Sequence, residues 1–240
     1  MERTRSETLK RFVVSDVGRR SLLLSSTRST RWWQSSWPRS AAPFPVSIKD
    51  GKIVYERYLN RADAKTHFNS YSMAKSFNSI LVGLAIADGH IRSVLDPVEK
   101  YVPELKNSGY GGTTIKDLLE MRSGVEWNDN FFAEGSTAHK AHVAAWVEGS
   151  ARYTDFAAGA KRAHPPGTVF NYDTMDAAVV GLVVERAVKM PISRYLSDRL
   201  WKPAGMESYA FYVIDGPPGI GREFSGGGFN LCCATTPVSG

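Results

Sequence analysis

Apolar residues recur at helical spacing in the stretch that follows Ser72. The positions concerned are Met73, Phe77, Ile80, Leu81 and Leu84. Residues spaced at i, i+4, i+7, i+8 and i+11 lie on one face of an α-helix. Gly89 is a typical helix end, because glycine readily adopts the left-handed conformation that closes a helix. The pattern therefore predicts a largely buried helix that begins at Ser72 and ends before Gly89.

Two other stretches favour extended structure. Residues 45–49 and 52–58 alternate apolar and polar side chains, and the Asp50-Gly51 pair between them is a strong hairpin signal. The short run 229–231 has the character of the start of another element. We therefore expect a β-hairpin where the folded region begins, which would supply the N-terminal strands of the sheet.

Between these stretches the chain favours helices. Thr113 and Thr114 are suited to cap a helix over 115–121. A strongly apolar run over 177–184 and an amphipathic run over 192–201 are separated by a proline, which interrupts a helix. With residues 90–200 predicted to be mostly helical, the mixture of strands and helices indicates an α/β protein of the α+β type.

The first forty residues differ in composition from the rest. They hold nine Lys and Arg residues against three acids, in a chain of 240 residues with a formal net charge of +6. A basic, serine-rich segment without apolar periodicity is typical of a solvated leader. We predict a poorly ordered leader over 1–43 and one folded domain over 44–240.

Composition also bears on partners and location. A nucleic-acid-binding module needs a basic face on a folded domain, and the basic excess lies mainly in the leader, so no nucleic-acid partner is expected. No apolar run is long enough to span a membrane and no signal peptide is recognised, which predicts a cytoplasmic protein. A periplasmic location stays open if residue 1 is not the native start. His139 and His142 lack the further ligands of a metal site, and no metal or cofactor is predicted.

Ser72 and Lys75 are candidates for a nucleophile and its base. Their spacing places both side chains on one face of a helix, about one turn apart. A serine hydroxyl is a weak nucleophile at neutral pH, and a neighbouring lysine can accept its proton when the amine is neutral. A Ser-x-x-Lys match is weak evidence by itself, because ordinary helices contain the same pair. The rest of the chain must supply the partners.

Several stretches of the chain carry further motifs in a fixed order. They are Asp50–Val54, Tyr71–Phe77, Leu95–Val98, Tyr101–Leu105, Thr114–Leu119, Pro166–Tyr172, Trp201–Met206 and Gly226–Asn230. Together they resemble the serine β-lactamase and penicillin-binding superfamily, and more closely the class C-type β-lactamase-related esterases and amidases, which include the 6-aminohexanoate-dimer hydrolases. The resemblance covers about residues 44–230. It implies an antiparallel sheet flanked by helices, a mostly helical insertion, and a cleft between them.

The resemblance also implies roles for individual residues. Tyr172 matches the tyrosine of the family's Tyr-x-Asn motif and would share proton transfer with Lys75, because a nearby ammonium favours the phenolate. Thr174 stands where the family has Asn, and its hydroxyl can still donate or accept a hydrogen bond. The substrate-binding residues that we predict are Trp127, Phe131, Phe132, Thr174, Gly227 and Gly228. The aromatic side chains of this set could instead fix their loop, residues 125–137, onto the core.

These roles predict a serine hydrolase that cleaves an ester or amide bond of a small molecule through an acyl-enzyme on Ser72, with Lys75 and Tyr172 as general base and acid. The substrate and the oligomeric state stay open. The family's third motif, Lys-Thr-Gly or His-x-Gly, has no match after Gly228. We therefore expect a C-terminally incomplete domain that lacks the last strands of the sheet, a loss that could impair activity. Two alternatives stand beside this prediction: a non-catalytic fragment or pseudoenzyme of the same fold, and a penicillin-binding carboxypeptidase.

Overall fold

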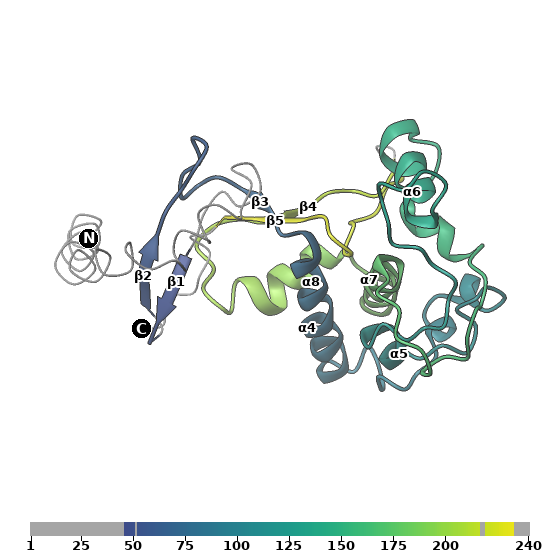
Figure 1. Cartoon of the computed structure of the whole chain (residues 1–240). Helices are drawn as coiled ribbons and strands as arrows, with labels where there is room; N and C mark the ends of the chain where they lie inside the picture. The colour runs from purple at the N-terminus through teal and green to yellow at the C-terminus, as the bar shows by residue number, and fades with distance from the viewer. Residues whose placement is uncertain (1–45, 51, 217–218, 233–240) are drawn as a thin grey trace. The chain divides into compact units, whose positions relative to one another are not determined.

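The computed structural model describes residues 46–50, 52–216 and 219–232 (Figure 1). These residues belong to two compact units, which are described separately: residues 46–66 together with Cys232, and residues 67–231. The predicted leader, residues 1–43, lies outside the described residues. The division into a leader and one domain over 44–240 therefore stays a prediction.

The first unit contains the predicted β-hairpin. Strand β1 (Val46–Lys49) pairs antiparallel with β2 (Lys52–Glu56), and Lys49 lies opposite Lys52. Asp50 has a φ of 52°, a left-handed conformation that aspartate tolerates in tight hairpin turns. The two strands form a two-stranded sheet. The hairpin is confirmed, whereas its place as the start of the main sheet stays a prediction.

The second unit contains a three-stranded antiparallel sheet of very short strands. Strand β5 (Phe229–Leu231) lies at its centre, between β3 (Phe68–Asn69) and β4 (Phe211–Tyr212). The side chain of Phe229 is buried and contacts the ring of Tyr212. The element predicted to start at Phe229 is thus a strand, and it joins segments that are far apart along the chain.

The chain passes from β3 into helix α4 through a tight turn. Residues Tyr71–Met73 form a 3₁₀ turn, and α4 spans Ala74–Ala87, so the regular helix begins two residues later than predicted. Tyr71 has a φ of 46°, and its N–H donates to the side-chain carbonyl of Asn69 at 2.9 Å. The N–H of Ser70 donates to the carbonyl of Phe229 at 2.8 Å, which ties the turn to β5. Ser72 therefore lies at a fixed junction between sheet and helix.

The buried face of α4 differs by one residue from the predicted stripe. The buried positions are Ala74, Asn78, Leu81, Val82 and Ala85. They keep the predicted period but start at Ala74, while Met73 and Ile80 of the predicted stripe are 65% and 43% exposed. Small alanines and a buried asparagine lie on this face, and the Asn78 side-chain amide donates to the Ala177 carbonyl at 2.9 Å. A count of large apolar residues alone places the stripe wrongly.

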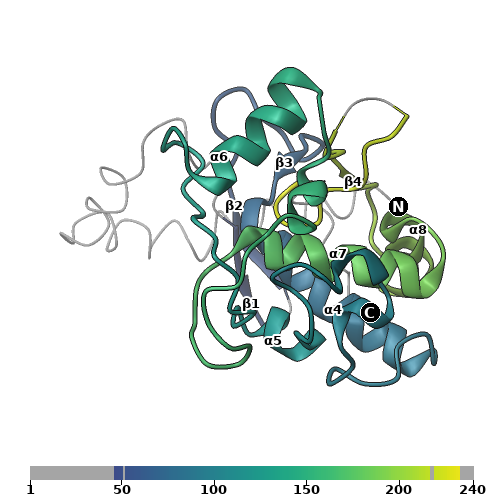
Figure 2. The ribbon, with the colours of Figure 1, turned by 90° about the vertical axis from the view of Figure 1, so that its right-hand side faces the viewer.

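Helix α7 (Thr174–Val188) is the most buried helix of the second unit and packs against α4 (Figures 1 and 2). Every residue from Thr174 to Val184 is buried. The Asp173 carboxylate caps its first turn, accepting the N–H groups of Met175 at 2.6 Å and Asp176 at 3.3 Å. The apolar helix predicted over 177–184 is confirmed, and its cap places Tyr172 immediately before the helix.

The remaining helices of the second unit are short. They are α5 (Ile115–Leu119), α6 (Thr137–His142) with its π-helical continuation Val143–Glu148, α8 (Ile192–Leu196) with its continuation Ser197–Trp201, and the 3₁₀ turns Val98–Lys100, Pro103–Leu105 and Tyr153–Ala157. Thr114 caps α5 as predicted, but the helix ends at Leu119, because Met121 has a φ of 54°. Helices do occupy residues 90–200, but long turns separate them.

We predict that the cap of α5 contributes measurably to stability. The Thr114 hydroxyl accepts the N–H of Asp117 at 3.1 Å, and the Asp117 carboxylate accepts the N–H of Thr114 at 2.9 Å. Thr114→Ala removes the first bond and should lower the free energy of unfolding by about 1 kcal/mol in urea titrations. Thr114→Ser keeps the hydroxyl and should stay close to wild type. Equal stability of the alanine and serine variants would contradict this account.

Candidate active site

The structure brings Ser72, Lys75 and Tyr172 together where α4 begins. The Lys75 ammonium donates to Ser72 Oγ at 3.1 Å, and the Tyr172 hydroxyl donates to the same atom at 2.7 Å. Lys75 Nζ lies 5.2 Å from the centre of the Tyr172 ring. The Ser72 side chain is exposed, so a small molecule can reach its oxygen. A hydroxyl, an amine and a phenol are thus within reach of proton transfer.

Lys75 is held by three acceptors. Besides Ser72 Oγ, its ammonium donates to the hydroxyl of Thr174 at 3.2 Å and to the carbonyl of Gly226 at 2.6 Å. A lysine ammonium has three N–H donors, so each of them has a partner. These partners come from the turn before α4, from the first residue of α7 and from the segment before β5. The amine is therefore positioned by three separate parts of the unit.

The three glycines before β5, Gly226–Gly228, form a segment that we call the glycine segment. It contacts Lys75 through the carbonyl of Gly226. A Cβ on this residue would lie 2.8 Å from Cγ2 of Thr174, so no larger residue fits beside α7. Gly227 lies next to the backbone of Tyr71 and is partly exposed. Gly228 is buried, and its carbonyl accepts the N–H of Val213 at 2.8 Å within the sheet. The substrate-binding roles predicted for Gly227 and Gly228 stay predictions, and the direct contact to Lys75 comes from their neighbour.

The three aromatic residues of the loop 125–137 lie in different surroundings. Trp127 is buried, and its ring meets that of Tyr153 edge-on at 6.0 Å. Phe131 is half-buried and stacks on the same tyrosine at 6.2 Å. Phe132 is 97% exposed. Trp127 and Phe131 thus pack against Tyr153, whereas Phe132 is exposed; the substrate-binding roles of all three stay predictions.

Asp129 belongs to the site, although the sequence did not single it out. Its carboxylate accepts the N–H of Thr174 at 2.9 Å, the hydroxyl of Thr174 at 2.9 Å, and Nε1–H of Trp127 at 3.1 Å. The loop contains other acids, including Glu126 and Glu134, and nothing in the spacing distinguishes Asp129 from them. A tryptophan two residues before the acid is the one signal that could have found it.

A pair of buried carboxyl groups lies under the first turn of α7. Asp176 is fully buried and accepts the hydroxyl of Tyr110 at 3.0 Å. Burial raises the pKa of Asp176 to about 7. Burial also raises the pKa of Asp173 well above its ordinary value, and the nearby Asp176 carboxylate raises it further. The residue that follows Tyr172 is therefore an acid that resists ionisation.

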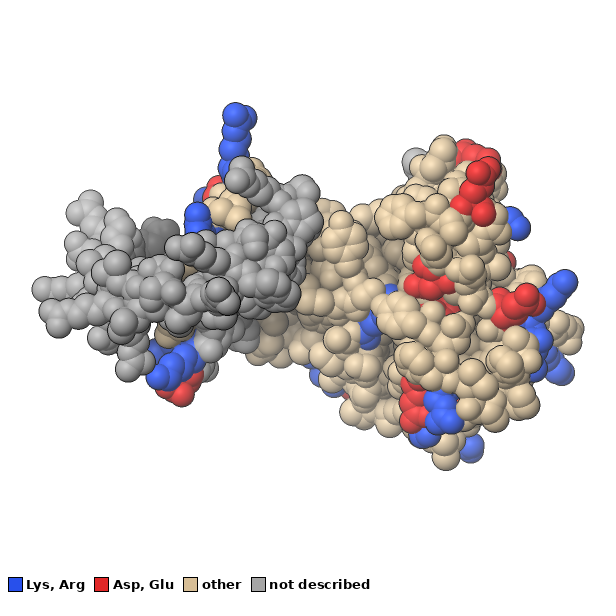
Figure 3. Space-filling model, in the orientation of Figure 1, with Lys and Arg blue, Asp and Glu red and all other residues tan. Residues whose placement is uncertain are grey.

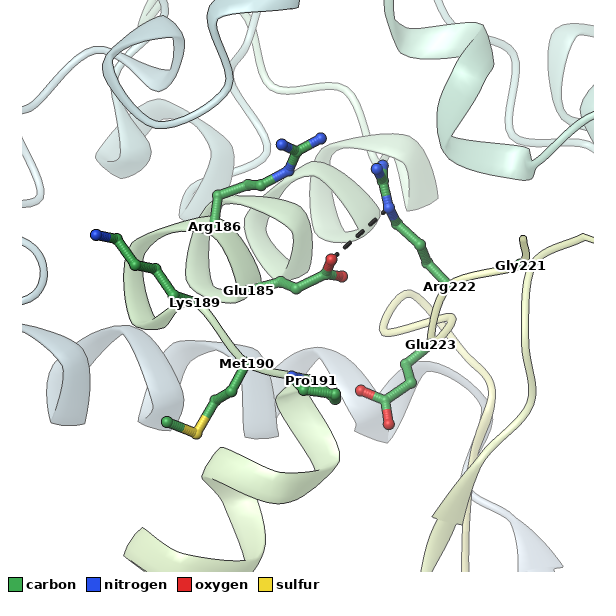
Figure 4. Close-up of a pocket in the computed structure, with 8 residues that line it drawn as sticks. All are labelled: Glu185, Arg186, Lys189, Met190, Pro191, Gly221, Arg222 and Glu223. Atoms are coloured by element: carbon green, nitrogen blue, oxygen red, sulfur yellow. Dashed lines mark ion pairs between the residues drawn. The ribbon is translucent and has the colours of Figure 1, made fainter. Parts of the chain in front are cut away.

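A pocket lies where α7 ends, between the last turn of that helix and the segment 221–223 (Figure 4). Its volume is about 710 Å³, and its walls are Glu185, Arg186, Lys189, Met190, Pro191, Gly221, Arg222 and Glu223. Arg222 and Glu185 form an ion pair across it at 3.7 Å. It contains none of the predicted site residues. On the face of residues 67–231 shown in Figure 3, acidic and basic side chains are interspersed.

The described part of the chain holds neither a cluster of metal ligands nor a helix suited to cross a bilayer. No three His, Cys, Asp or Glu side chains there are grouped to hold a metal ion. His139 Nδ1 instead lies 3.0 Å from the carbonyl of Phe131, and the ring of His142 packs on Phe131 and Trp146. None of the helices described combines the length and the apolar character that crossing a bilayer requires.

The acid pair predicts a pH-dependent stability. Between about pH 4 and pH 7 the folded protein keeps a proton on Asp176 that the unfolded chain releases, so the free energy of unfolding should fall as pH rises through this window. Asp176→Asn mimics the protonated acid and should flatten the slope, which urea titrations at several pH values would measure. The control is Asp198→Asn, because ion pairing lowers the pKa of Asp198 and its effect falls below this window. A slope unchanged in Asp176→Asn would refute the assignment.

Comparison with known proteins agrees with the predicted fold. Protein flp of Staphylococcus aureus is 26% identical over 175 residues, which cover 68% of this chain and 33% of the relative. A 6-aminohexanoate-dimer hydrolase of Paenarthrobacter ureafaciens is 27% identical over 161 residues, which cover 65% of this chain and 40% of the relative. The chain thus spans between a third and two fifths of the length of these relatives.

A solved structure from Bacillus anthracis, provisionally named a 6-aminohexanoate-dimer hydrolase, superimposes with a TM-score of 0.67 at 24% identity, covering 78% of this chain and 50% of that one. This likeness establishes the β-lactamase/transpeptidase-like fold, with helices around an antiparallel sheet, that the motifs predicted. The sequence model of the beta-lactamase family matches residues 45–218. Because that match spans well over half of the sequence, the chain belongs to the beta-lactamase family.

Proposed function

We propose that this protein is a serine hydrolase that cleaves an ester or amide bond through an acyl-enzyme on Ser72. One observation carries the proposal: Ser72 Oγ accepts hydrogen bonds from the amine of Lys75 and the phenol of Tyr172 at the same time. A serine becomes a nucleophile when a base adjoins it. Membership of the beta-lactamase family and similarity to a hydrolase of an amide-linked dimer support the same chemistry.

The acylation step needs one base and returns one proton. Lys75 as a neutral amine, or Tyr172 as a phenolate, takes the proton from Ser72 Oγ while this oxygen bonds to the carbonyl carbon of the substrate. The bond from that carbon to the leaving nitrogen or oxygen then breaks, and the leaving group takes up the proton. In the second half, a water molecule gives a proton to the same base as its oxygen bonds to the acyl carbon. The bond from that carbon to Ser72 Oγ then breaks, Oγ takes up the proton, and the carboxylic acid leaves. The Lys75–Tyr172 pair ends in its starting protonation state.

The local backbone supports this role. Ser72 lies in the 3₁₀ turn that leads into α4, so its backbone N–H belongs to the start of the helical segment, where partial positive charge favours a developing oxyanion. The preceding residue, Tyr71, holds a φ of 46°, a conformation that a bulky residue adopts only where the surroundings enforce it. Such strain is common beside nucleophiles, because it presents the side chain to the substrate.

Covalent labelling tests the nucleophile. A fluorophosphonate probe should label the wild-type protein on the peptide that contains Ser72, and Ser72→Ala should not be labelled, because the attacking oxygen is gone. Ser76→Ala removes an exposed hydroxyl one turn along the same helix and serves as the matched control, with wild-type labelling expected. Equal labelling of wild type and Ser72→Ala would end the proposal, and a wild type without label or ester turnover would favour a non-catalytic protein.

Hydrolysis of p-nitrophenyl esters tests the proton-transfer pair. Tyr172→Phe and Lys75→Ala should each lower kcat by about 100- to 10,000-fold, the range for loss of a general acid–base group, with a smaller change in KM. Tyr209→Phe removes the hydroxyl of another exposed tyrosine and should leave kcat unchanged. Wild-type kcat in Tyr172→Phe would show that the phenol takes no part in the reaction.

A further inference from the structure

We infer that Asp129 is a positioning residue for Lys75, acting through the hydroxyl of Thr174. The inference rests on the proposed function, since it assigns a role within the same site. The hydrogen bonds run from Lys75 Nζ to Thr174 Oγ1 at 3.2 Å, and from that hydroxyl to Asp129 Oδ2 at 2.9 Å. Asp129 is thus connected to the amine of Lys75 through a single side chain, that of Thr174.

The direction of these bonds is fixed by chemistry. A hydroxyl has one hydrogen, and an ionised carboxylate can only accept hydrogen bonds. The hydrogen of Thr174 therefore points at Asp129, and the lone pairs of its oxygen face Lys75. This arrangement makes Thr174 a permanent acceptor for the amine. It leaves Lys75 with its other two N–H groups directed at Ser72 Oγ and the Gly226 carbonyl.

The side chain of Thr174 is also held in place by its methyl group. Thr174 is buried, and Gly226 approaches so closely that a Cβ there would lie 2.8 Å from Cγ2 of Thr174. The methyl group therefore packs against the glycine segment, and the hydroxyl turns toward Asp129 and Lys75. A threonine can do both, whereas a serine would lack the contact that fixes its rotamer.

Asp129 itself is held by two N–H groups. Its Oδ1 accepts the backbone N–H of Thr174 at 2.9 Å and Nε1–H of Trp127 at 3.1 Å, so the carboxylate is clamped between the loop and the first turn of α7. With these two bonds alone, Asp129 would only fix the loop 125–137 to the start of α7. The third bond, from Oδ2 to the threonine hydroxyl, is the one that reaches the amine, and the two roles are separable because different oxygens perform them.

The test is Asp129→Asn, with kcat and KM measured separately for p-nitrophenyl ester hydrolysis. The amide oxygen can keep both N–H donors, but the amide nitrogen would donate to the Thr174 hydroxyl and turn its hydrogen toward Lys75. We expect kcat to fall about 10- to 100-fold, the loss for one hydrogen bond to a charged group. The loss should fall on kcat rather than on KM, because in this inference Asp129 acts on Lys75 and does not touch the substrate. If Asp129 only fixed the loop, the amide oxygen would keep both N–H bonds and kcat would stay close to wild type.

A double-mutant cycle isolates the route through the hydroxyl. Thr174→Val keeps the shape of the side chain but cannot relay the bond, so by itself it should lower kcat by a similar factor. In this background Asp129→Asn should cost less than about threefold, because the step it disturbs is already lost. Glu126→Gln removes an exposed acid of the same loop and is the charge control, with wild-type kcat and KM expected.

Each outcome decides the inference. Wild-type activity in Asp129→Asn, a loss confined to KM, or full additivity with Thr174→Val would overturn it. Thermal unfolding of every variant checks the fold, and if Asp129→Asn fails to fold, wild-type activity in Thr174→Val alone would still overturn the inference. Fluorophosphonate labelling of wild-type Ser72 distinguishes failure of the proposed function from failure of the role assigned to Asp129. Without it the proposed function fails, whereas labelling with unaffected Asp129→Asn kinetics refutes only the role of Asp129.

Discussion

The site depends on the three hydrogen bonds of the Lys75 ammonium. Its acceptors are Ser72 Oγ, Thr174 Oγ1 and the Gly226 carbonyl, and they belong to the turn before α4, the start of α7 and the segment before β5. A lysine side chain has four rotatable bonds and loses much conformational entropy when it is fixed. Three acceptors in one place offset that loss. The packing of α4 on α7 therefore bears directly on the chemistry available to Ser72.

The support for the site is polar as well as apolar. The amide of Asn78 joins α4 to the carbonyls of Ala177 and Ser225, so the buried seam between α4, α7 and the glycine segment contains hydrogen bonds. The acid pair of Asp173 and Asp176 caps and underlies the same end of α7. Buried polar groups of this kind cost stability unless they are satisfied. Their concentration around one helix end is typical of a site in which geometry takes precedence over stability.

The sequence predicted the elements whose signals are local. The Asp50-Gly51 turn gave the hairpin, the apolar run gave α7, and Ser-x-x-Lys with Tyr172 gave three groups that the fold brings together. Such signals depend on turn chemistry and helical period, which neighbouring residues determine. That Tyr172 lies near Ser72 was predicted from the order of the family motifs. Local spacing could not predict it, because the two residues are a hundred positions apart.

Features that depend on close packing could not be predicted. The buried face of α4 lies one residue from the predicted stripe, because Ala74, Ala85 and Asn78 are buried by the approach of α7 and the glycine segment. Asp129 and Gly226 gain their importance only from residues distant along the chain. The left-handed conformation of Tyr71 could not be predicted either, since a bulky residue adopts it only when the surrounding structure constrains the backbone.

The central claim is that Ser72 becomes covalently acylated, and mass spectrometry of a quenched reaction tests it most directly. The protein would be mixed with a p-nitrophenyl ester, quenched in acid within the first turnover, digested and sequenced by fragmentation. The account predicts that the mass of the acyl group is added to the peptide containing Ser72, on that residue, and that this adduct disappears as product forms. Turnover with the acyl group on a different residue, or with no adduct at any time, would contradict it.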